Sequence, residues 1–240
     1  MRICVDRRGK RIIKHRICFG VVVLLLLPAA LILPNANRET LLSVPYISQK
    51  GKLATGCELV SAAMVLNYYG KNVSVEDVVE ATPHTDLTET QNGLTGKHPS
   101  QSFIGDPHSP DGFGCYAPVV TSVMNSFLPE SGKKAINLTG AELEELALNR
   151  VANGSPVILW ATMNMKEPRP GKSWTLTGTG ETFRWIAGEH CLVLVGFNKD
   201  SYFFNDPYDS NGIIFFDKEL VKTRYESLGK QAVAVEDGAA

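Results

Sequence analysis

The C-terminal part of the sequence contains apolar segments that are separated by turn residues. They read ETFRWI, GEHCLVLVGF, SYFFNDPY and NGIIFF, with turns at Ala187-Gly188, Asn198-Lys199-Asp200 and Asp209-Ser210-Asn211-Gly212. Short apolar runs bounded by Gly, Asn, Asp and Ser are typical of β-strands joined by tight connections. Residues 155–163 (SPVILWATM) and 231–236 (QAVAVE) predict two further strands. The sequence therefore predicts a sheet of antiparallel neighbours in this part of the chain.

Most of the helical patterns come before these strands. Helices are predicted over residues 57–69, 74–82, 117–128 and 139–153, and one more over 217–229. Helices first and antiparallel strands after indicate an α+β fold, because a parallel sheet would need the two kinds of element to alternate.

Local signals mark the ends of several helices. Thr55 is the expected N-cap of the first helix, and Gly70 is its expected stop. Ser74 and Thr139 are each followed three residues later by an acidic residue, which predicts a capping box at the start of the second and fourth helices, with Asp77 and Glu142 as partners.

Two stretches show little periodicity. Residues 83–116 are rich in Gly, Pro, Asp, Ser and His, and residues 164–180 are rich in Pro and Gly. Irregular stretches of this length are uncommon in a compact domain and are often functional. We expect residues 83–116 to shape or cover a cleft.

The N-terminus predicts export. A basic segment, residues 1–16, precedes an unbroken apolar run, residues 17–33. The run has the minimum length for crossing a bilayer, and the basic flank would hold the N-terminus in the cytoplasm. Residues 17–33 are thus a transmembrane anchor or a signal sequence; we favour an uncleaved anchor, because no small-x-small cleavage site follows. The domain that follows, residues 41–236, would lie outside the membrane, or be secreted if the segment is cleaved.

Composition excludes one class of partner. Lys plus Arg (24) nearly equals Asp plus Glu (25), and the basic residues follow no single surface element. A nucleic-acid-binding surface is therefore not expected. The length suits one globular domain in addition to the N-terminal segment. The oligomeric state is not indicated.

Three cysteines lie in the predicted exported domain: Cys57, Cys115 and Cys191. An odd number leaves at least one unpaired within the chain, and a bridge between Cys115 and Cys191 stays open. No cysteine or histidine cluster has the spacing of a zinc site, so neither a structural metal nor a cofactor is expected.

Cys57 is the first residue of an apolar helical pattern, directly after Gly56. The positive end of the helix dipole favours a thiolate, which would lower the pKa of the thiol below its free value of about 8.5. A buried cysteine that only packs explains the same position. Helix position alone favours packing, so the decision rests on whether the chain supplies a base.

His190 is the histidine that the pattern singles out. It opens the apolar strand HCLVLVGF, where an unpartnered polar ring would be costly, whereas His84, His98 and His108 fall in the irregular stretch. If HCLVLVGF and SYFFNDPY pair as a hairpin, the end of the second strand returns to His190. Asp206 or Asn205 would then orient the imidazole; we favour Asp206, because a carboxylate also stabilises imidazolium.

The segments QKGKLATGCELVSAAMVLNYYG, GSPVILWATM, GEHCLVLVGF and NDPY together resemble the papain-like cysteine peptidases that are related to the bacteriocin-processing, double-glycine leader peptidases. The resemblance is closest to stand-alone, membrane-tethered or exported bacterial relatives and covers residues 41–235. The spacing from Cys57 to His190 also falls within the 130 to 150 residues or so that separate these groups in papain-type enzymes. The resemblance implies a papain-like fold, with the helix that carries the nucleophile packed on a C-terminal antiparallel sheet.

The resemblance also implies roles for individual residues. Cys57 would be the nucleophile, His190 the general base and acid, and Asp206 the residue that orients the histidine. A glutamine upstream of the cysteine would stabilise the oxyanion, and Gln49 is the one shortly upstream. Gln49 lies eight residues ahead of Cys57, whereas six is usual in papain-type enzymes, so a solvated loop position is the alternative.

Three functions are compatible with these residues. The first is an exported or anchored cysteine peptidase that hydrolyses a peptide or protein through a thioester. The second is a thiol-dependent amidase or transpeptidase acting on cell-wall peptides. The third is an inactive binding module of the same fold. An intact set of Cys57, His190 and Asp206 favours the first two over the third.

Overall fold

The computed structural model describes residues 39–129, 132–208 and 212–238, all of which belong to one compact unit, 36–240. The predicted anchor, residues 17–33, lies outside the described residues. Within the described ranges, no helix is both long enough and apolar enough to cross a membrane.

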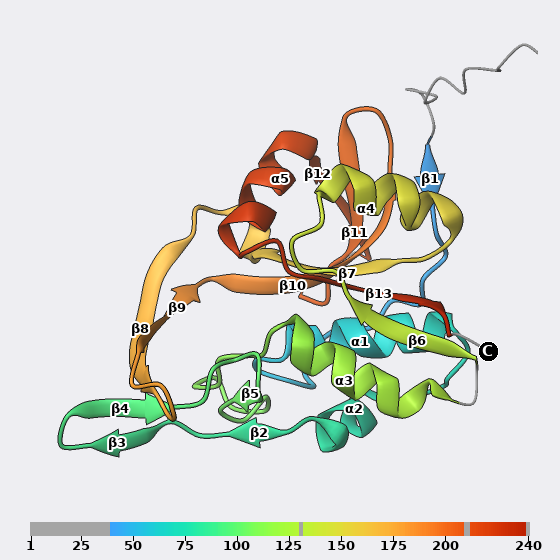
Figure 1. The fold of residues 1–240 in the computed structure, drawn as a ribbon. Helices are drawn as coiled ribbons and strands as arrows, with labels where there is room; N and C mark the ends of the chain where they lie inside the picture. The colour runs from blue at the N-terminus through green and yellow to red at the C-terminus, as the bar shows by residue number, and fades with distance from the viewer. Residues whose placement is uncertain (1–38, 130–131, 209–211, 239–240) are drawn as a thin grey trace, which may run out of the picture. The chain divides into compact units, whose positions relative to one another are not determined.

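The α+β prediction is confirmed. A seven-stranded sheet has helices on both faces, and a smaller four-stranded sheet lies beside it (Figure 1). The helices are α1 (Cys57–Tyr68), α2 (Val75–Ala81), α3 (Ala117–Phe127), α4 (Leu143–Asn149) and α5 (Lys218–Ser227), with short 3-10 turns η2 (Val151–Asn153) and η3 (Met163–Met165). The strands of the large sheet are β1 (Thr40–Leu41), β6 (Lys133–Asn137), β7 (Val157–Thr162), β10 (Glu189–Phe197), β11 (Ser201–Asn205), β12 (Ile213–Asp217) and β13 (Ala232–Asp237).

The large sheet has the order β12-β11-β10-β7-β13-β6, and β1 also pairs with β10. Every pairing in it is antiparallel. The predicted hairpin of β10 with β11 is present, with Val193 opposite Asn205. This register brings the end of β11 back toward the start of β10.

The central strands β7, β10 and β13 bury both faces, and alternate residues enter two different cores. Cys191, Val193 and Val195 pack toward the layer of α1, α2 and α3. Leu192 and Leu194 pack toward α4 and α5. This alternation follows from the two-residue period of a strand and explains why β10 is an unbroken apolar run.

Helix α1 lies across the sheet and is buried over nearly its whole length. Its N-cap is Gly56, in a left-handed conformation at φ 98°, and not Thr55 as predicted. The Thr55 hydroxyl instead donates to carbonyl groups of the 106–109 loop. Gly70, at φ 77°, ends the helix as predicted.

The two predicted capping boxes have different outcomes. The Ser74 and Asp77 box is confirmed at the start of α2, with both reciprocal hydrogen bonds present. The box at Thr139 and Glu142 is wrong. Thr139 bonds to Asn137 instead, and α4 begins one turn later and is much shorter than the predicted helix.

Both stretches that lack periodicity contain strands. The first holds β2 (His84–Thr85), β3 (Thr88–Thr90), β4 (Gly93–Gly96) and β5 (Phe103–Ile104), and the second holds β8 (Arg169–Leu176). With β9 (Thr182–Ala187) they form the four-stranded sheet β3-β4-β8-β9 and the pair β2-β5. An aromatic cluster of Phe113, Tyr116, Trp174, Phe183 and Trp185 links this sheet to the body.

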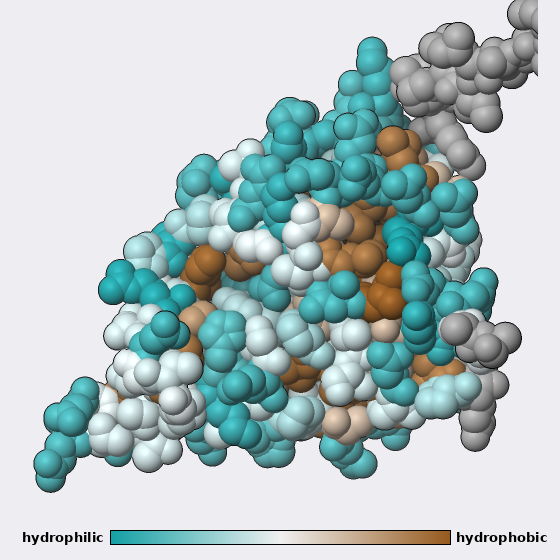
Figure 2. Space-filling view, viewed as in Figure 1, coloured by the Kyte–Doolittle hydropathy of each residue, from teal (hydrophilic) through white to brown (hydrophobic). Residues whose placement is uncertain are grey.

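The outer surface is mostly hydrophilic on the face shown in Figure 2, and hydrophobic residues form small separate patches there. The most exposed large hydrophobic side chain among the described residues is Phe215, at 70%. Ile213, at 47%, lies two residues before it on strand β12 and therefore on the same face of the strand.

Candidate active site

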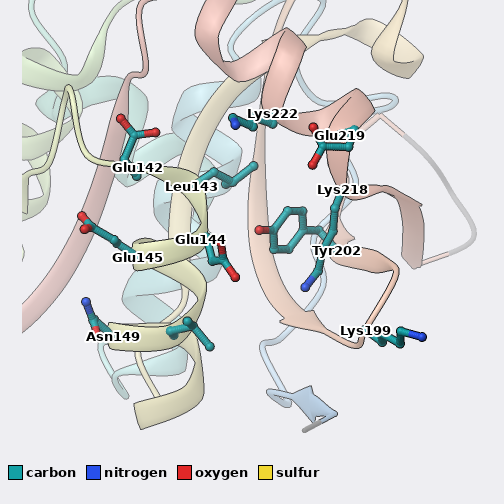
Figure 3. Close-up of a pocket in the computed structure, with 11 residues that line it drawn as sticks. Glu142, Leu143, Glu144, Glu145, Asn149, Lys199, Tyr202, Lys218, Glu219 and Lys222 are labelled. Carbon is teal, nitrogen blue, oxygen red and sulfur yellow. The ribbon is translucent and has the colours of Figure 1, made fainter. Parts of the chain in front are cut away.

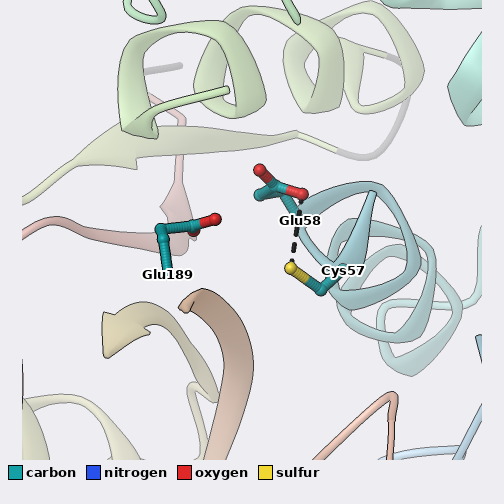
Figure 4. Close-up of side chains that lie close together, drawn as sticks. All are labelled: Cys57, Glu58 and Glu189. Carbon is teal, nitrogen blue, oxygen red and sulfur yellow. Dashed lines mark hydrogen bonds between the residues drawn. The ribbon is translucent and has the colours of Figure 1, made fainter. Parts of the chain in front are cut away.

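Cys57 occupies the first position of α1 and is almost buried, at 8% exposure. The backbone N–H of Cys191 donates to Cys57 Sγ at 3.2 Å, and the thiol lies 3.4 Å from Glu58 Oε2 as its hydrogen-bond donor (Figure 4). The third residue of β10 and the first turn of α1 therefore hold the sulfur between them.

His190 and Asp206 form a buried pair. His190 Nε2 lies 2.7 Å from Asp206 Oδ1, and both side chains are at most 2% exposed. Asp206 Oδ1 also accepts from the backbone N–H of Tyr208 at 2.8 Å, which fixes the carboxyl group. When Nε2–H donates to this carboxylate, the other nitrogen of a neutral ring, Nδ1, carries the lone pair.

The alternative partner, Asn205, has a different contact. Its Nδ2 donates to the carbonyl of Val44 at 3.0 Å and so ties the N-terminal segment of the domain to β11. The predicted contact of His190 with Asp206 is therefore present, and the Asn205 side chain bonds to Val44 instead.

Gln49 is buried beside Cys57, at 4% exposure, and is not a solvated loop residue. Its Nε2 donates weakly to the carbonyl of Ala54 at 3.4 Å, and its Oε1 has no hydrogen-bond partner among the described residues. A tight turn, in which Lys52 and Leu53 N–H groups both donate to the Gln49 carbonyl, absorbs the two extra residues between Gln49 and Cys57.

These residues meet at one small pocket of about 100 Å³. Its lining includes Gln49, Cys57, Glu189, His190 and Tyr208. The structure thus brings three of the four predicted site residues to one cavity, and the fourth, Asp206, lies directly behind His190.

Gly56 also lines the pocket, and the packing and the backbone conformation around it explain why this residue is a glycine. A Cβ there would meet Leu53 and Pro107 at 3.1 Å, and the backbone has a positive φ. The space that a side chain at position 56 would take is filled by Leu53 and Pro107.

Two carboxyl groups beside the thiol were not predicted as site residues. Glu58 is fully buried, and its Oε1 accepts from the backbone N–H of Cys115 at 2.8 Å. Glu189 precedes His190 on β10, and Figure 4 shows its carboxyl group directed toward Cys57 and Glu58. Burial is the main cause that raises the pKa of both carboxyl groups, and the charge of Glu58 raises the pKa of Glu189 further.

A glutamate in the first turn of a helix is favoured by the helix dipole whether or not it is buried, so the position of Glu58 in the sequence does not indicate its burial. The sequence did contain a signal that Glu189 lies near Cys57. It has the same strand parity as Cys191, so it had to share the face of β10 that packs toward α1.

The pKa of the Cys57 thiol is raised, opposite to the direction that helix position alone predicted. Burial is the largest cause, the Glu58 and Glu189 carboxyl groups add to it, and the N–H of Cys191 acts in the opposite direction. The sequence showed the helix start but not the two acids or the depth of burial, which outweigh the dipole.

The other two cysteines of the domain, Cys115 and Cys191, are buried free thiols, so the structure contains no bridge between them. Trp160 is fully buried, with its indole N–H donating to the Cys115 carbonyl at 3.0 Å, which confirms core packing for this residue.

A larger groove of about 580 Å³ lies between α4 and α5, next to β11 (Figure 3). Acidic side chains of α4 line one wall and Lys199, Lys218 and Lys222 the other. It contains none of the predicted site residues, so the smaller pocket at Cys57 is the candidate active site.

The fold defines the class of protein first: a helix that carries a cysteine at its start is packed on an antiparallel sheet that carries a paired histidine, as in papain-like cysteine peptidases. The family model described as Peptidase_C39 like family matches residues 41–233, so the chain belongs to this family.

The chain is also similar to individual proteins. The chain is 28% identical over 186 residues to YvpB, an uncharacterized protein of Bacillus subtilis (strain 168), covering 77% of this chain and 70% of that one. A crystal structure of a Bacillus anthracis protein assigned as a C39-like peptidase superposes with a TM-score of 0.75 at 25% identity, covering 85% of this chain and all of that one. A double glycine motif protease from an AMS/PCAT transporter, solved with its leader peptide, gives a TM-score of 0.43 at 19% identity and covers 82% of this chain and 91% of that one.

Proposed function

We propose that this protein is a cysteine peptidase that hydrolyses peptide bonds through Cys57, His190 and Asp206. The observation that carries the proposal is the buried pair of His190 with Asp206, at 2.7 Å, at the same small pocket as the thiol of Cys57. Asp206 holds the buried imidazole through a hydrogen bond, and a thiol with a raised pKa needs a neighbouring base of this kind to react.

The chemistry follows from the two nitrogens of His190. With Nε2 held by Asp206, Nδ1 takes the proton of the Cys57 thiol, and the thiolate attacks the carbonyl carbon of the substrate. The thiol must first turn away from Glu58, which accepts its hydrogen bond in the structure described here. His190 then protonates the leaving amine, and water hydrolyses the thioester.

The oxyanion would be held by two donors. One is the backbone N–H of Cys57, which points out of the first turn of α1 and has no partner within that turn. The other is Nε2 of Gln49, whose present bond to Ala54 is long, at 3.4 Å, and so is easily exchanged for a substrate oxygen.

We further propose that the domain works outside the cytoplasmic membrane. The support is the sequence of residues 1–33, in which a basic segment precedes an apolar run of membrane-spanning length. A peptide or protein outside the membrane would then be the substrate.

The decisive experiment uses an epoxide or iodoacetamide probe on the wild type and on Cys57→Ala and His190→Ala. We expect rapid labelling of the wild type at Cys57, none at this position in Cys57→Ala, and slow labelling in His190→Ala. Equal labelling rates for the wild type and His190→Ala would mean that the histidine does not activate the thiol, and the proposal would be wrong.

A second assay separates the peptidase from an amidase or transpeptidase. Unstructured protein and isolated cell wall are offered in parallel, and released fragments are identified by mass spectrometry. We expect cleavage of the protein that requires Cys57. If fragments are released only from cell wall and not from the protein, the thiol catalyses the amidase or transpeptidase reaction instead.

A further inference from the structure

Three potential metal ligands converge at the start of α1 and β10. Cys57 Sγ, one carboxyl oxygen of Glu58 and one of Glu189 all lie within 4.8 Å of one another (Figure 4). Zinc bonds of about 2.3 Å to sulfur and 2.0–2.2 Å to oxygen place tetrahedral ligand atoms about 3.4–3.6 Å apart. Cys57 Sγ and Glu58 Oε2 are already 3.4 Å apart, and the Glu189 oxygen, which lies within 4.8 Å of both, would move toward them on binding.

Two unpartnered atoms at the same place point independently to a bound cation. His190 is 1% exposed, and its Nδ1 forms no hydrogen bond with any described residue; the ring lines the same pocket as Cys57 and Glu189. Glu189 Oε1 is likewise buried without a partner within the described part of the chain. Buried polar atoms are rarely left unsatisfied, so both require an explanation.

The charge balance around the cluster favours a cation. Neither Glu58 nor Glu189 takes part in an ion pair of the described residues. Two neighbouring buried carboxyl groups cannot both ionise without a positive charge beside them. A divalent cation supplies that charge, and the lining of the small pocket gives it a route to the sulfur.

We propose that Cys57, Glu58 and Glu189 form a zinc site, with a fourth position that His190 Nδ1 reaches only by a shift of its ring. A set of one thiolate and two carboxylates suits Zn²⁺, whereas Mg²⁺ and Ca²⁺ prefer oxygen alone. On binding, the thiol proton and any carboxyl proton pass to solvent, and no group is oxidised or reduced. The ion occupies the sulfur, so zinc is a reversible inhibitor; this consequence rests on the proposed peptidase function.

Binding is measured first, without reference to activity. The full chain, with thiols reduced and the reductant removed, is titrated with ZnCl2 against a fluorescent zinc chelator, and with Co²⁺ to follow the thiolate-to-cobalt absorption in the near ultraviolet. We expect one ion whose cobalt band is lost in Cys57→Ala. Glu58→Gln and Glu189→Gln should each weaken zinc binding at least about tenfold.

Controls separate this site from other thiols and from unfolding. Residual binding in Cys57→Ala measures the contribution of Cys4, Cys18 and other groups. Glu80→Gln, an exposed glutamate on α2, is the matched variant and should bind zinc as the wild type does. Glu58→Gln keeps an oxygen to accept the Cys115 N–H, and Glu189→Gln carries the test if Glu58→Gln does not fold.

The proposal is wrong if Cys57→Ala keeps the cobalt band, or if both glutamine variants bind zinc as tightly as Glu80→Gln does. The inhibition is tested separately, as loss of peptide hydrolysis on adding ZnCl2 and its return with EDTA. If the metal-free wild type hydrolyses no peptide, the proposed function fails, while the binding measurements still decide whether the zinc site exists.

Discussion

At the scale of single residues, the pair of His190 and Asp206 sets what Cys57 can do. Asp206 accepts from the imidazole and from the backbone N–H of Tyr208 through the same oxygen, so two donors fix the position of this oxygen. The histidine is therefore presented in one orientation, with Nδ1 free of protein partners among the described residues. This is the atom that a general base requires.

Replacing Asp206 tests the orientation. We expect Asp206→Ala to lower kcat/KM by about a hundredfold or more, because the imidazole loses both its tautomer and its position. Asp206→Asn should retain more activity, since its amide oxygen can still accept from Nε2. Steady-state hydrolysis of a peptide measures the effect, with thermal unfolding to confirm that both variants fold. Equal activity of the two variants would contradict an orienting role.

Gln49 gives a second prediction at this scale. If its Nε2 binds the oxyanion, Gln49→Ala should lower kcat by about a hundredfold while Cys57 reacts with iodoacetamide at the rate of the wild type. Alkylation needs the thiolate but no oxyanion, so the two readouts separate the roles. A parallel loss of both rates would show that Gln49 supports the thiol or the local fold instead.

At the scale of elements, Glu58 connects α1 to the chain that leads into α3. Its Oε1 receives the Cys115 N–H, and Gly114 passes so close that an added Cβ would overlap this oxygen. The same Cβ would also meet the Trp185 ring at 3.2 Å. The backbone at Gly114 is thus fitted against the carboxyl group that contacts Cys57.

This contact predicts the effect of Gly114→Ala. We expect a loss of about 1–3 kcal/mol in the free energy of unfolding, from overpacking against Glu58 and Trp185. Gly140→Ala is the matched control, because Gly140 also has a positive φ but a Cβ there meets nothing within 4 Å. Urea unfolding measures both. If Gly114→Ala and Gly140→Ala lose the same free energy of unfolding, overpacking against Glu58 and Trp185 is not the cause.

At the scale of the whole molecule, the sequence predicted what local patterns determine. The strands predicted from apolar runs between turns, the Ser74 capping box and the contact of His190 with Asp206 all depend on residues that are close along the chain or joined by one hairpin. The α+β order and the family followed from the same segments.

The sequence could not show contacts that the tertiary fold creates between distant segments. Thr55 bonds to the 106–109 loop and so does not cap α1, and β8 forms because β4 and β9 pair with it. Glu58 and Glu189 meet beside Cys57 only because α1 lies across β10. The direction of the Cys57 pKa was missed for the same reason, since burial depends on this packing.

The N-terminal segment carries the last prediction, because the proposed export rests on the sequence of residues 1–33. The full chain expressed in bacteria should sediment with membranes, and added protease should digest its folded domain in cells whose outer layers have been removed. Leu25→Arg combined with Leu26→Arg should release it, since each Arg at the centre of a spanning helix costs about 2.5–3.5 kcal/mol. Sequencing the N-terminus of the mature protein distinguishes an anchor, which starts at residue 1, from a cleaved signal. Full-length wild type that is soluble and protected from protease would place the catalytic domain in the cytoplasm and contradict export.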